Sequence, residues 1–176
     1  MRVGGEVLEA DKIVIAAGAW SAELVAPLGV TLAVAPQRAQ ISHLGLPGVA
    51  TASWPVVLPV SSRYLLAFPD SRVVAGATRE TGSGFDYRVT AAGQREVLAH
   101  ALAVAPGLGD ATLLETRIGF RPVTADQLPL LGPLEKHPNV LVATGFGASG
   151  LTLAPFALAA IAALVSGDRP PIDVAP

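Results

Sequence analysis

Residues 139–155 read NVLVATGFGASGLTLAP, the stretch that says most about the fold. The aliphatic run at 140–144 predicts a buried strand. Gly145, Gly147 and Gly150 then match the dinucleotide-binding pattern G-x-G-x-x-G, and residues 151–165 predict a helix. The order strand, glycine loop, helix is typical of the first turn of a nucleotide-binding α/β fold.

The same pattern also requires a second strand after the helix. The 26 residues after Gly150 supply one helix and a polar, proline-rich stretch, so they disfavour a dinucleotide-binding βαβ unit. Two interpretations of the loop stay open on spacing alone. Its free backbone N–H groups suit an anion or an electron-rich carbonyl such as that of a reduced flavin, or its glycines serve only a tight turn and close packing.

Outward from this loop, the chain predicts a mixed α and β fold with more strands than helices. Two helices are expected near 21–28 and at 91–104, with Ser21 and Thr90 as their N-caps. Four prolines predict that 121–138 is irregular. The other expected strands are 12–16, 31–34, 38–43, 63–68, 73–77 and 113–120, with a turn at 69–72.

Composition excludes several classes of protein. Hydrophobic residues make up 51% of the 176 and charged residues 15%, which is typical of a folded domain. A net charge of −2 disfavours nucleic-acid binding. The absence of cysteine excludes disulfides, thiolate metal sites and a cysteine nucleophile, and the scattered His43, His100 and His137 predict no metal site. No signal peptide is visible, so we expect a cytoplasmic protein.

The uncharged stretch 139–167 raises the question of a membrane span. Its glycine loop would break a helix exposed to lipid. The 15 residues from 151 to 165 fall short of the roughly 20 that cross a bilayer. We therefore expect a buried helix of a globular protein and no membrane span.

Three segments together resemble one family of flavoenzymes. Residues 10–21 read ADKIVIAAGAWS, residues 119–132 read GFRPVTADQLPLLG, and the third segment is 139–155. In this order they are similar to three motifs of the D-amino-acid oxidase superfamily, which includes glycine oxidase, sarcosine oxidase and D-amino-acid dehydrogenase. The resemblance covers nearly the whole chain.

The resemblance implies an α+β fold in two parts. Members begin with a βαβ unit that binds the ADP half of FAD, and this sequence lacks that unit. It resembles a carboxy-terminal portion: the last strands and helix of a Rossmann-like FAD-binding domain plus the mixed sheet of a substrate domain. The implied boundaries are 1–30 and 122–167 for the partial FAD-binding domain, 31–121 for the substrate-binding domain and 168–176 for a tail.

The resemblance also implies roles for individual residues. Arg121 would bind the carboxylate of the substrate, and Tyr64 would line the substrate pocket. The residues alone favour instead the pairing of Arg121 with a surface acid such as Glu115 or Asp126. For Tyr64 they fit a core residue equally well. The residues implied to contact FAD are Ala17, Gly18, Trp20, Gly145, Phe146, Gly147, Ala148, Ser149, Gly150, Leu151 and Thr152.

The function implied is oxidation of a small amino acid or secondary amine by hydride transfer to flavin, with no side chain acting as a catalytic base. The glycine oxidase branch carries a second substrate arginine where this sequence has Ala148, which puts a glycine substrate in doubt. A partner chain could supply the missing Rossmann unit. The alternative is a non-catalytic fragment, or a subunit that completes a partner flavoprotein.

Overall fold

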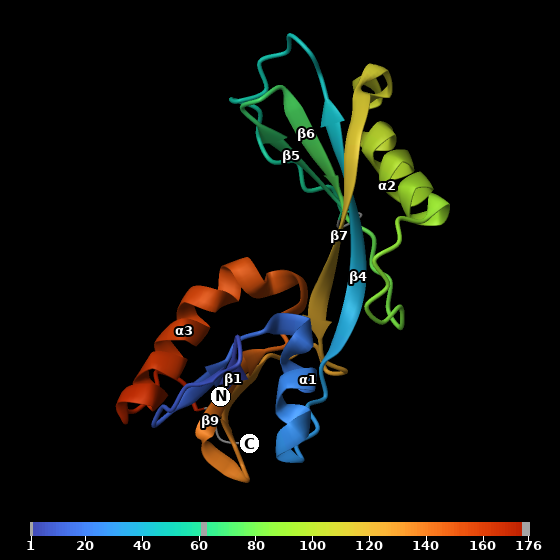
Figure 1. Ribbon diagram of the computed structural model, residues 1–176. Helices are drawn as coiled ribbons and strands as arrows, with labels where there is room; N and C mark the ends of the chain where they lie inside the picture. Colours follow the sequence, from blue (N-terminus) through green and yellow to red (C-terminus); the bar gives the residue numbers. More distant parts are fainter. Residues whose placement is uncertain (1, 61–62, 174–176) are drawn as a thin grey trace. The chain divides into compact units, whose positions relative to one another are not determined.

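The computed structural model describes residues 2–60 and 63–173 and forms two compact units (Figure 1). The first unit comprises the chain up to Pro36 and from Arg121 onward, and the second comprises 37–120. Of the tail predicted at 168–176, residues 174–176 lie outside the described residues. The predicted mixture of α and β structure is confirmed.

The first unit is built on a three-stranded sheet in the order β3-β9-β8. Strand β3 (Ile13–Ile15) runs parallel to β9 (His137–Thr144), and β8 (Leu130–Leu134) runs antiparallel to β9. Helix α1 (Ser21–Val25) contributes Val25 to the core of this unit. The other buried members of that core are Leu134, Val140 and Val142.

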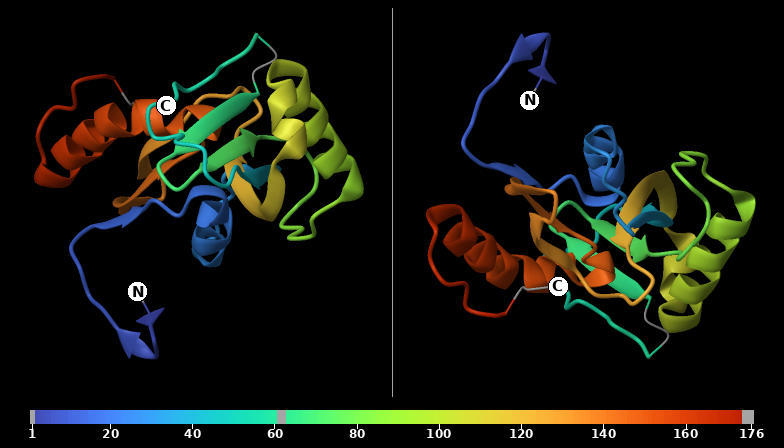
Figure 2. Two further views of the ribbon diagram at one scale, coloured as in Figure 1. Left: turned by 90° about the horizontal axis from the view of Figure 1, so that it is seen from above. Right: turned by 90° about the horizontal axis from the view of Figure 1, so that it is seen from below.

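Two further parts complete the first unit. A hairpin of β1 (Arg2–Val3) and β2 (Glu6–Val7) precedes the sheet and is joined to β3 by an extended segment (Figure 2). The last helix, α3 (Gly150–Ser166), follows the 3-10 turn η4 (Gly147–Ser149). Two more 3-10 turns flank α1: η1 (Gly18–Trp20) and η2 (Ala26–Leu28).

The second unit is an antiparallel sheet covered by a helix, with the strand order β5-β6-β4-β7. Its strands are β4 (Ala35–Gly45), β5 (Tyr64–Phe68), β6 (Arg72–Gly76) and β7 (Thr112–Val123). Helix α2 (Ala91–Val104) begins as predicted, because the Thr90 side chain accepts a hydrogen bond from the backbone N–H of Gly93 at 3.2 Å. The turn η3 (Pro106–Asp110) ends it.

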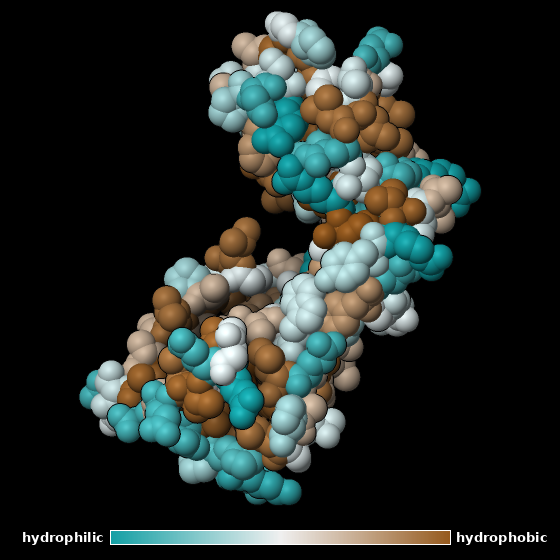
Figure 3. Space-filling model, in the orientation of Figure 1, coloured by the Kyte–Doolittle hydropathy of each residue, from teal (hydrophilic) through white to brown (hydrophobic). Residues whose placement is uncertain are grey.

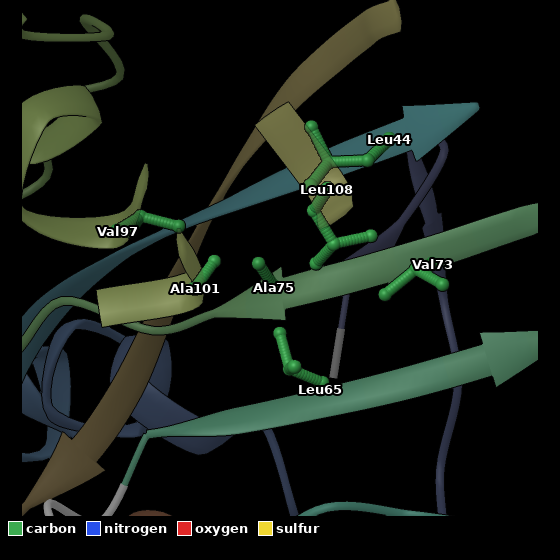
Figure 4. Packing of buried hydrophobic residues seen from close by; sticks show 7 residues of the cluster. All are labelled: Leu44, Leu65, Val73, Ala75, Val97, Ala101 and Leu108. Atoms are coloured by element: carbon green, nitrogen blue, oxygen red, sulfur yellow. The ribbon is translucent and has the colours of Figure 1, made fainter. Parts of the chain in front are cut away.

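The core of this unit joins α2 to the sheet. Val97 and Ala101 of α2 pack on β4, β5 and β6 (Figure 4). Every buried member is at most 8% exposed: Leu44, Leu65, Val73, Ala75, Val97, Ala101 and Leu108. Their spacing in β6 and α2 follows the periods of strand and helix.

Prolines account for the wrongly predicted elements. The stretch 121–138 is not irregular: β7 continues through Pro122, and β8 contains Pro133. Both strands lie at a sheet edge, where a missing N–H costs no ladder bond, and β8 has an irregularity at Pro133. The predicted strand at 31–34 is absent, and β4 starts later and runs through Pro36.

Both helices of the first unit also differ from expectation. Ser21 is not an N-cap but the first helical residue of α1, because η1 leads directly into the helix from Trp20. Helix α3 starts inside the glycine loop and is longer than the predicted 151–165. The sequence predicts a buried helix, yet within this chain α3 is mostly exposed. Of the described residues, Gly147–Ser166 form one helical stretch whose length and apolar composition suffice to cross a membrane, and 17% of its 18-residue apolar window is buried.

Candidate functional site

Two glycine-containing loops leave the first unit's sheet at the same end. Ile13 lies opposite Val140 and Ile15 opposite Val142 in the parallel pair of β3 and β9. The loop beginning at Ala16 follows β3, and the loop beginning at Gly145 follows β9. Ligands of open α/β sheets bind outside the carboxyl ends of the strands, so these loops lie where a ligand is expected.

Thr144 joins the two loops. Its side chain is fully buried, and its Oγ1 donates a hydrogen bond to the carbonyl oxygen of Gly18 at 2.7 Å. Gly18 and Gly145 have φ angles of 55° and 79°, which side chains with a Cβ rarely adopt. A Cβ on Gly145 would also lie 3.0 Å from Thr124 Cγ2. Glycine is therefore the residue that this backbone conformation favours at both positions.

The start of α3 lies just beyond Gly145. Ser149 precedes the helix, and among the described residues its side chain makes no capping hydrogen bond. The first N–H groups of a helix carry the positive end of its dipole. This end suits the electron-rich N1 and C2=O region of a flavin, so the residues present fit that group.

The structure brings together most of the predicted flavin residues. Ala17 and Gly18 lie beside the β9 loop through the Thr144 hydrogen bond, and Trp20, 40% exposed, ends η1 in the same segment. The predicted residues 145–152 run from the end of β9 through η4 into the first turn of α3. Gly145 is buried, whereas Ala148, Ser149, Leu151 and Thr152 are exposed.

The two predicted substrate residues lie in different units, Arg121 in the first and Tyr64 in the second. Arg121 lies in β7, directly before Pro122, and is half-buried. Tyr64 is the first residue of β5, opposite Gly76 of β6. A Cβ on Gly76 would lie 2.7 Å from the Tyr64 hydroxyl oxygen, so this glycine leaves room for the phenol.

Sequence reasoning missed a buried polar network in the second unit. Arg38, 7% exposed, donates through Nε to Glu80 Oε2 at 3.0 Å and forms an ion pair with Asp86 at 2.7 Å. Fully buried Gln40 donates to Glu80 Oε1 at 2.7 Å and to Thr90 Oγ1 at 2.9 Å. The network ties β4 to the loop after β6 and to the start of α2.

The surroundings of this network stabilise the charged forms of its two carboxylates, Glu80 and Asp86. Burial by itself raises the pKa of Glu80, but hydrogen bonds from Thr78, Gln40 and Arg38 outweigh it and lower the pKa. Hydrogen bonds from Arg88 lower the pKa of Asp86. The available signal was three polar residues at alternating positions of β4, Arg38, Gln40 and Ser42, a spacing that places their side chains on one face.

Comparisons with known proteins agree with the resemblance in the sequence. A family model described as "FAD dependent oxidoreductase" (DAO) matches residues 1–164. An uncharacterized oxidoreductase, YurR, from Bacillus subtilis is 49% identical over 95% of this chain, and glycine oxidase from Pseudomonas aeruginosa is 36% identical over 98%. The crystal structure of iminodiacetate oxidase from Chelativorans sp. BNC1 is 54% identical over 95% of this chain, with a TM-score of 0.90.

The chain spans about half the length of these relatives. It covers 45% of the B. subtilis protein, 46% of the P. aeruginosa protein and 45% of the crystallised chain. Each relative therefore contains more sequence than this chain matches.

Proposed function

The chain belongs to the DAO family of FAD-dependent oxidoreductases, and we propose that it is the carboxy-terminal part of an enzyme that oxidises a small amino acid or secondary amine. The observation that supports this most directly is the pair of loops at the carboxyl ends of β3 and β9, joined by Thr144 and Gly18. In this proposal the first unit is part of the FAD-binding domain and the second is part of the substrate domain. The cytoplasm is the proposed location.

The flavin ring is proposed to lie against the two loops. Backbone groups of Ala17, Gly18 and residues 145–152 would hold it, with Trp20 nearby. The uncapped start of α3 would stabilise negative charge on the ring. FAD supplies the hydride acceptor when bound, and the chain supplies binding and orientation.

Arg121 is proposed to bind the substrate carboxylate. A guanidinium binds a carboxylate through two parallel hydrogen bonds, which fixes both position and direction. Pro122 restricts the backbone of Arg121 to extended conformations, which keeps this residue in β7. Tyr64 is the other predicted substrate residue, since its hydroxyl group can donate a hydrogen bond to a carboxylate.

A secondary amine is the substrate class that we favour. Ala148 occupies the position at which the glycine oxidase branch has a second substrate arginine. A methyl group there leaves more room than a guanidinium. The similarity to iminodiacetate oxidase, which is named for a secondary amine with two carboxylates, supports the same class.

The first test is the visible absorption spectrum of the chain purified in excess FAD and then freed of unbound cofactor. Retained flavin supports the proposed loops as a flavin site. If the chain is colourless, the same measurement is made with the chain co-produced with the part of the B. subtilis relative that it does not span. Absence of flavin from that complex as well would contradict the proposal.

The second test replaces Arg121 with Ala in the flavin-loaded protein. We expect kcat/KM for iminodiacetate to fall about 10- to 100-fold, since hydrogen bonds to charged groups contribute about 1.5–3 kcal/mol. The bound flavin per chain should stay constant. Arg95→Ala, an exposed arginine on α2, is the matched control and should change neither quantity. An unchanged kcat/KM in Arg121→Ala would remove Arg121 from the substrate site.

A further inference from the structure

His43 is a buried histidine that the proposed function does not use. Leu44 and Val73 pack beneath α2 (Figure 4). Neighbouring side chains of a strand point to opposite faces, so His43 of β4 and Arg72 of β6 lie on the face of the sheet away from α2. His43 is 4% exposed there, and its Nε2 is a buried atom without a hydrogen-bond partner among the described residues.

The contact between His43 and Arg72 fixes the position of the imidazole proton. Arg72 Nη1 lies 3.2 Å from His43 Nδ1. A guanidinium has only donors, so Nδ1 accepts this hydrogen bond and carries no proton. His43 is therefore neutral in this arrangement, with its proton on Nε2. A second proton, on Nδ1, would break the bond and place two cations side by side.

Glu115 of β7 is a different partner that suits a protonated His43. Its Oε1 lies 3.6 Å from His43 Nδ1 and 2.5 Å from Arg117 Nη2. The hydrogen bond from Arg117 lowers the pKa of Glu115, so this carboxylate is charged in the pH range where histidine titrates. A protonated Nδ1 can donate to Glu115, whereas a neutral Nδ1 that accepts from Arg72 cannot.

The other charged groups that face His43 are in contact with water. Figure 3 shows hydrophilic residues interspersed with hydrophobic ones at the visible surface. The side chains of Asp70, Glu115 and Arg117 are 62%, 45% and 57% exposed. Burial lowers the pKa of His43, as do the charges of Arg117 and Arg72. The charges of Glu115 and Asp70 raise it without cancelling that effect, so protonation belongs to acidic pH.

Arg72 also belongs to the turn that joins β5 to β6. The central carbon of its guanidinium lies 4.8 Å from the centroid of the Phe68 ring. Its Nε lies 3.2 Å from Asp70 Oδ2. The Arg72 side chain therefore connects His43 with both ends of this turn.

The same turn holds the segment that follows β4. The carbonyl oxygen of Ser71 accepts a hydrogen bond from the backbone N–H of Leu46 at 2.8 Å. The hydroxyl group of Ser71 donates to the carbonyl oxygen of Val49, also at 2.8 Å. Ser71 directly precedes Arg72, so a displacement of Arg72 acts on both hydrogen bonds.

We propose that His43 is a proton-dependent switch for this turn. Neutral His43 accepts a hydrogen bond from Arg72 and holds the turn in place. At acidic pH, Nδ1 takes up a proton from water and donates to Glu115, and Arg72 is released. The turn then loses its hold on residues 46–49. The switch does not depend on the proposed flavin chemistry.

The first test is the nitrogen NMR spectrum of the His43 ring in the isotope-labelled chain. At pH 7.5 we expect a proton on Nε2 and none on Nδ1. On acidification we expect both nitrogens to carry a proton, together with a change in the side-chain resonances of Arg72. A proton on Nδ1 at pH 7.5 would overturn the inference.

The second test is hydrogen exchange of the Leu46 amide, which reports on its bond to Ser71. After correction for the intrinsic effect of pH on exchange, we expect its protection to fall at least tenfold between pH 7.5 and 5.0. In His43→Gln the side-chain oxygen accepts from Arg72 at both pH values, so the protection should stay constant. His100→Gln, on α2, is the matched control and should retain the fall of the wild type.

Arg72→Met gives an independent check, because it removes the donor that His43 holds. The protection of the Leu46 amide should then be low already at pH 7.5 and should not change with pH. The amides of α2 should keep their protection in every protein. Constant protection of Leu46 in the wild type, a fall that His43→Gln retains, or a parallel loss of protection in α2 would each overturn the switch.

Discussion

At the scale of single residues, His43 couples the stability of the second unit to pH. It is 4% exposed in β4, and its Nδ1 lies 3.2 Å from Arg72 Nη1 and 3.6 Å from Glu115. Burial lowers the pKa of His43 below its ordinary 6.5, and the charge of Arg117 lowers it further. Asp70 and Glu115 oppose this effect but do not cancel it.

The folded chain therefore resists protonation of His43 more than the unfolded chain does. Its contribution to stability is complete above pH 6.5 and decreases as the pH falls through the lowered pKa of the folded state, by at most about 1.4 kcal/mol per pH unit. We expect the free energy of unfolding to drop more between pH 7.5 and 5.5 in the wild type than in His43→Gln. Urea titrations at both values measure this, with His100→Gln as control. Equal pH dependence in wild type and His43→Gln would contradict it.

At the scale of elements, α2 lies so close to β4 that one of its positions must be glycine. A Cβ on Gly93 would lie 2.1 Å from Gln40 Nε2, and Gln40 is the fully buried centre of the polar network. Gly93→Ala should therefore displace Gln40 and cost about 2–4 kcal/mol, since overpacking and lost buried hydrogen bonds add up. Thermal unfolding measures the loss. Gly107→Ala, where a Cβ meets nothing within 4 Å, is the control, and equal melting temperatures would refute the expected clash.

Elements with local signals could be predicted from the sequence. The hairpin around residues 69–72 and the helix that begins after Thr90 are set by turn and capping residues close in sequence. Strand β8 could not be predicted, because Pro133 within it argues against a strand unless its place at a sheet edge is known. Edge positions depend on tertiary pairing, which no local pattern contains.

The candidate site likewise has one part that the local sequence predicts and one part that it does not. The glycine loop after β9 follows from its own spacing. Its hydrogen bond to Gly18 does not, because it depends on the parallel pairing of strands far apart in sequence. The role of Arg38 was missed because its partners, Glu80 and Asp86, come from a loop whose path depends on the finished sheet.

At the scale of the whole molecule, two compact units predict two unfolding events. Scanning calorimetry of the chain should resolve two transitions. Gly93→Ala should lower only that of the second unit. Lys12→Met removes the hydrogen bonds to the end of α3 and should lower only the melting temperature of the first unit. The corresponding loss in its free energy of unfolding is about 0.5–1 kcal/mol. A single transition that both variants shift would show that the units unfold together.

The parallel pairing of β3 with β9 also constrains the order of folding during synthesis. Ile13 leaves the ribosome long before its partner Val140, and the whole second unit is made between them. The second unit has all its strands in one continuous segment, so it can fold while translation continues. The first unit must wait for the last residues, and pairing across so long a separation is slow. The early β3 segment, apolar and unpaired until then, is thus the part of the nascent chain most in need of chaperone protection.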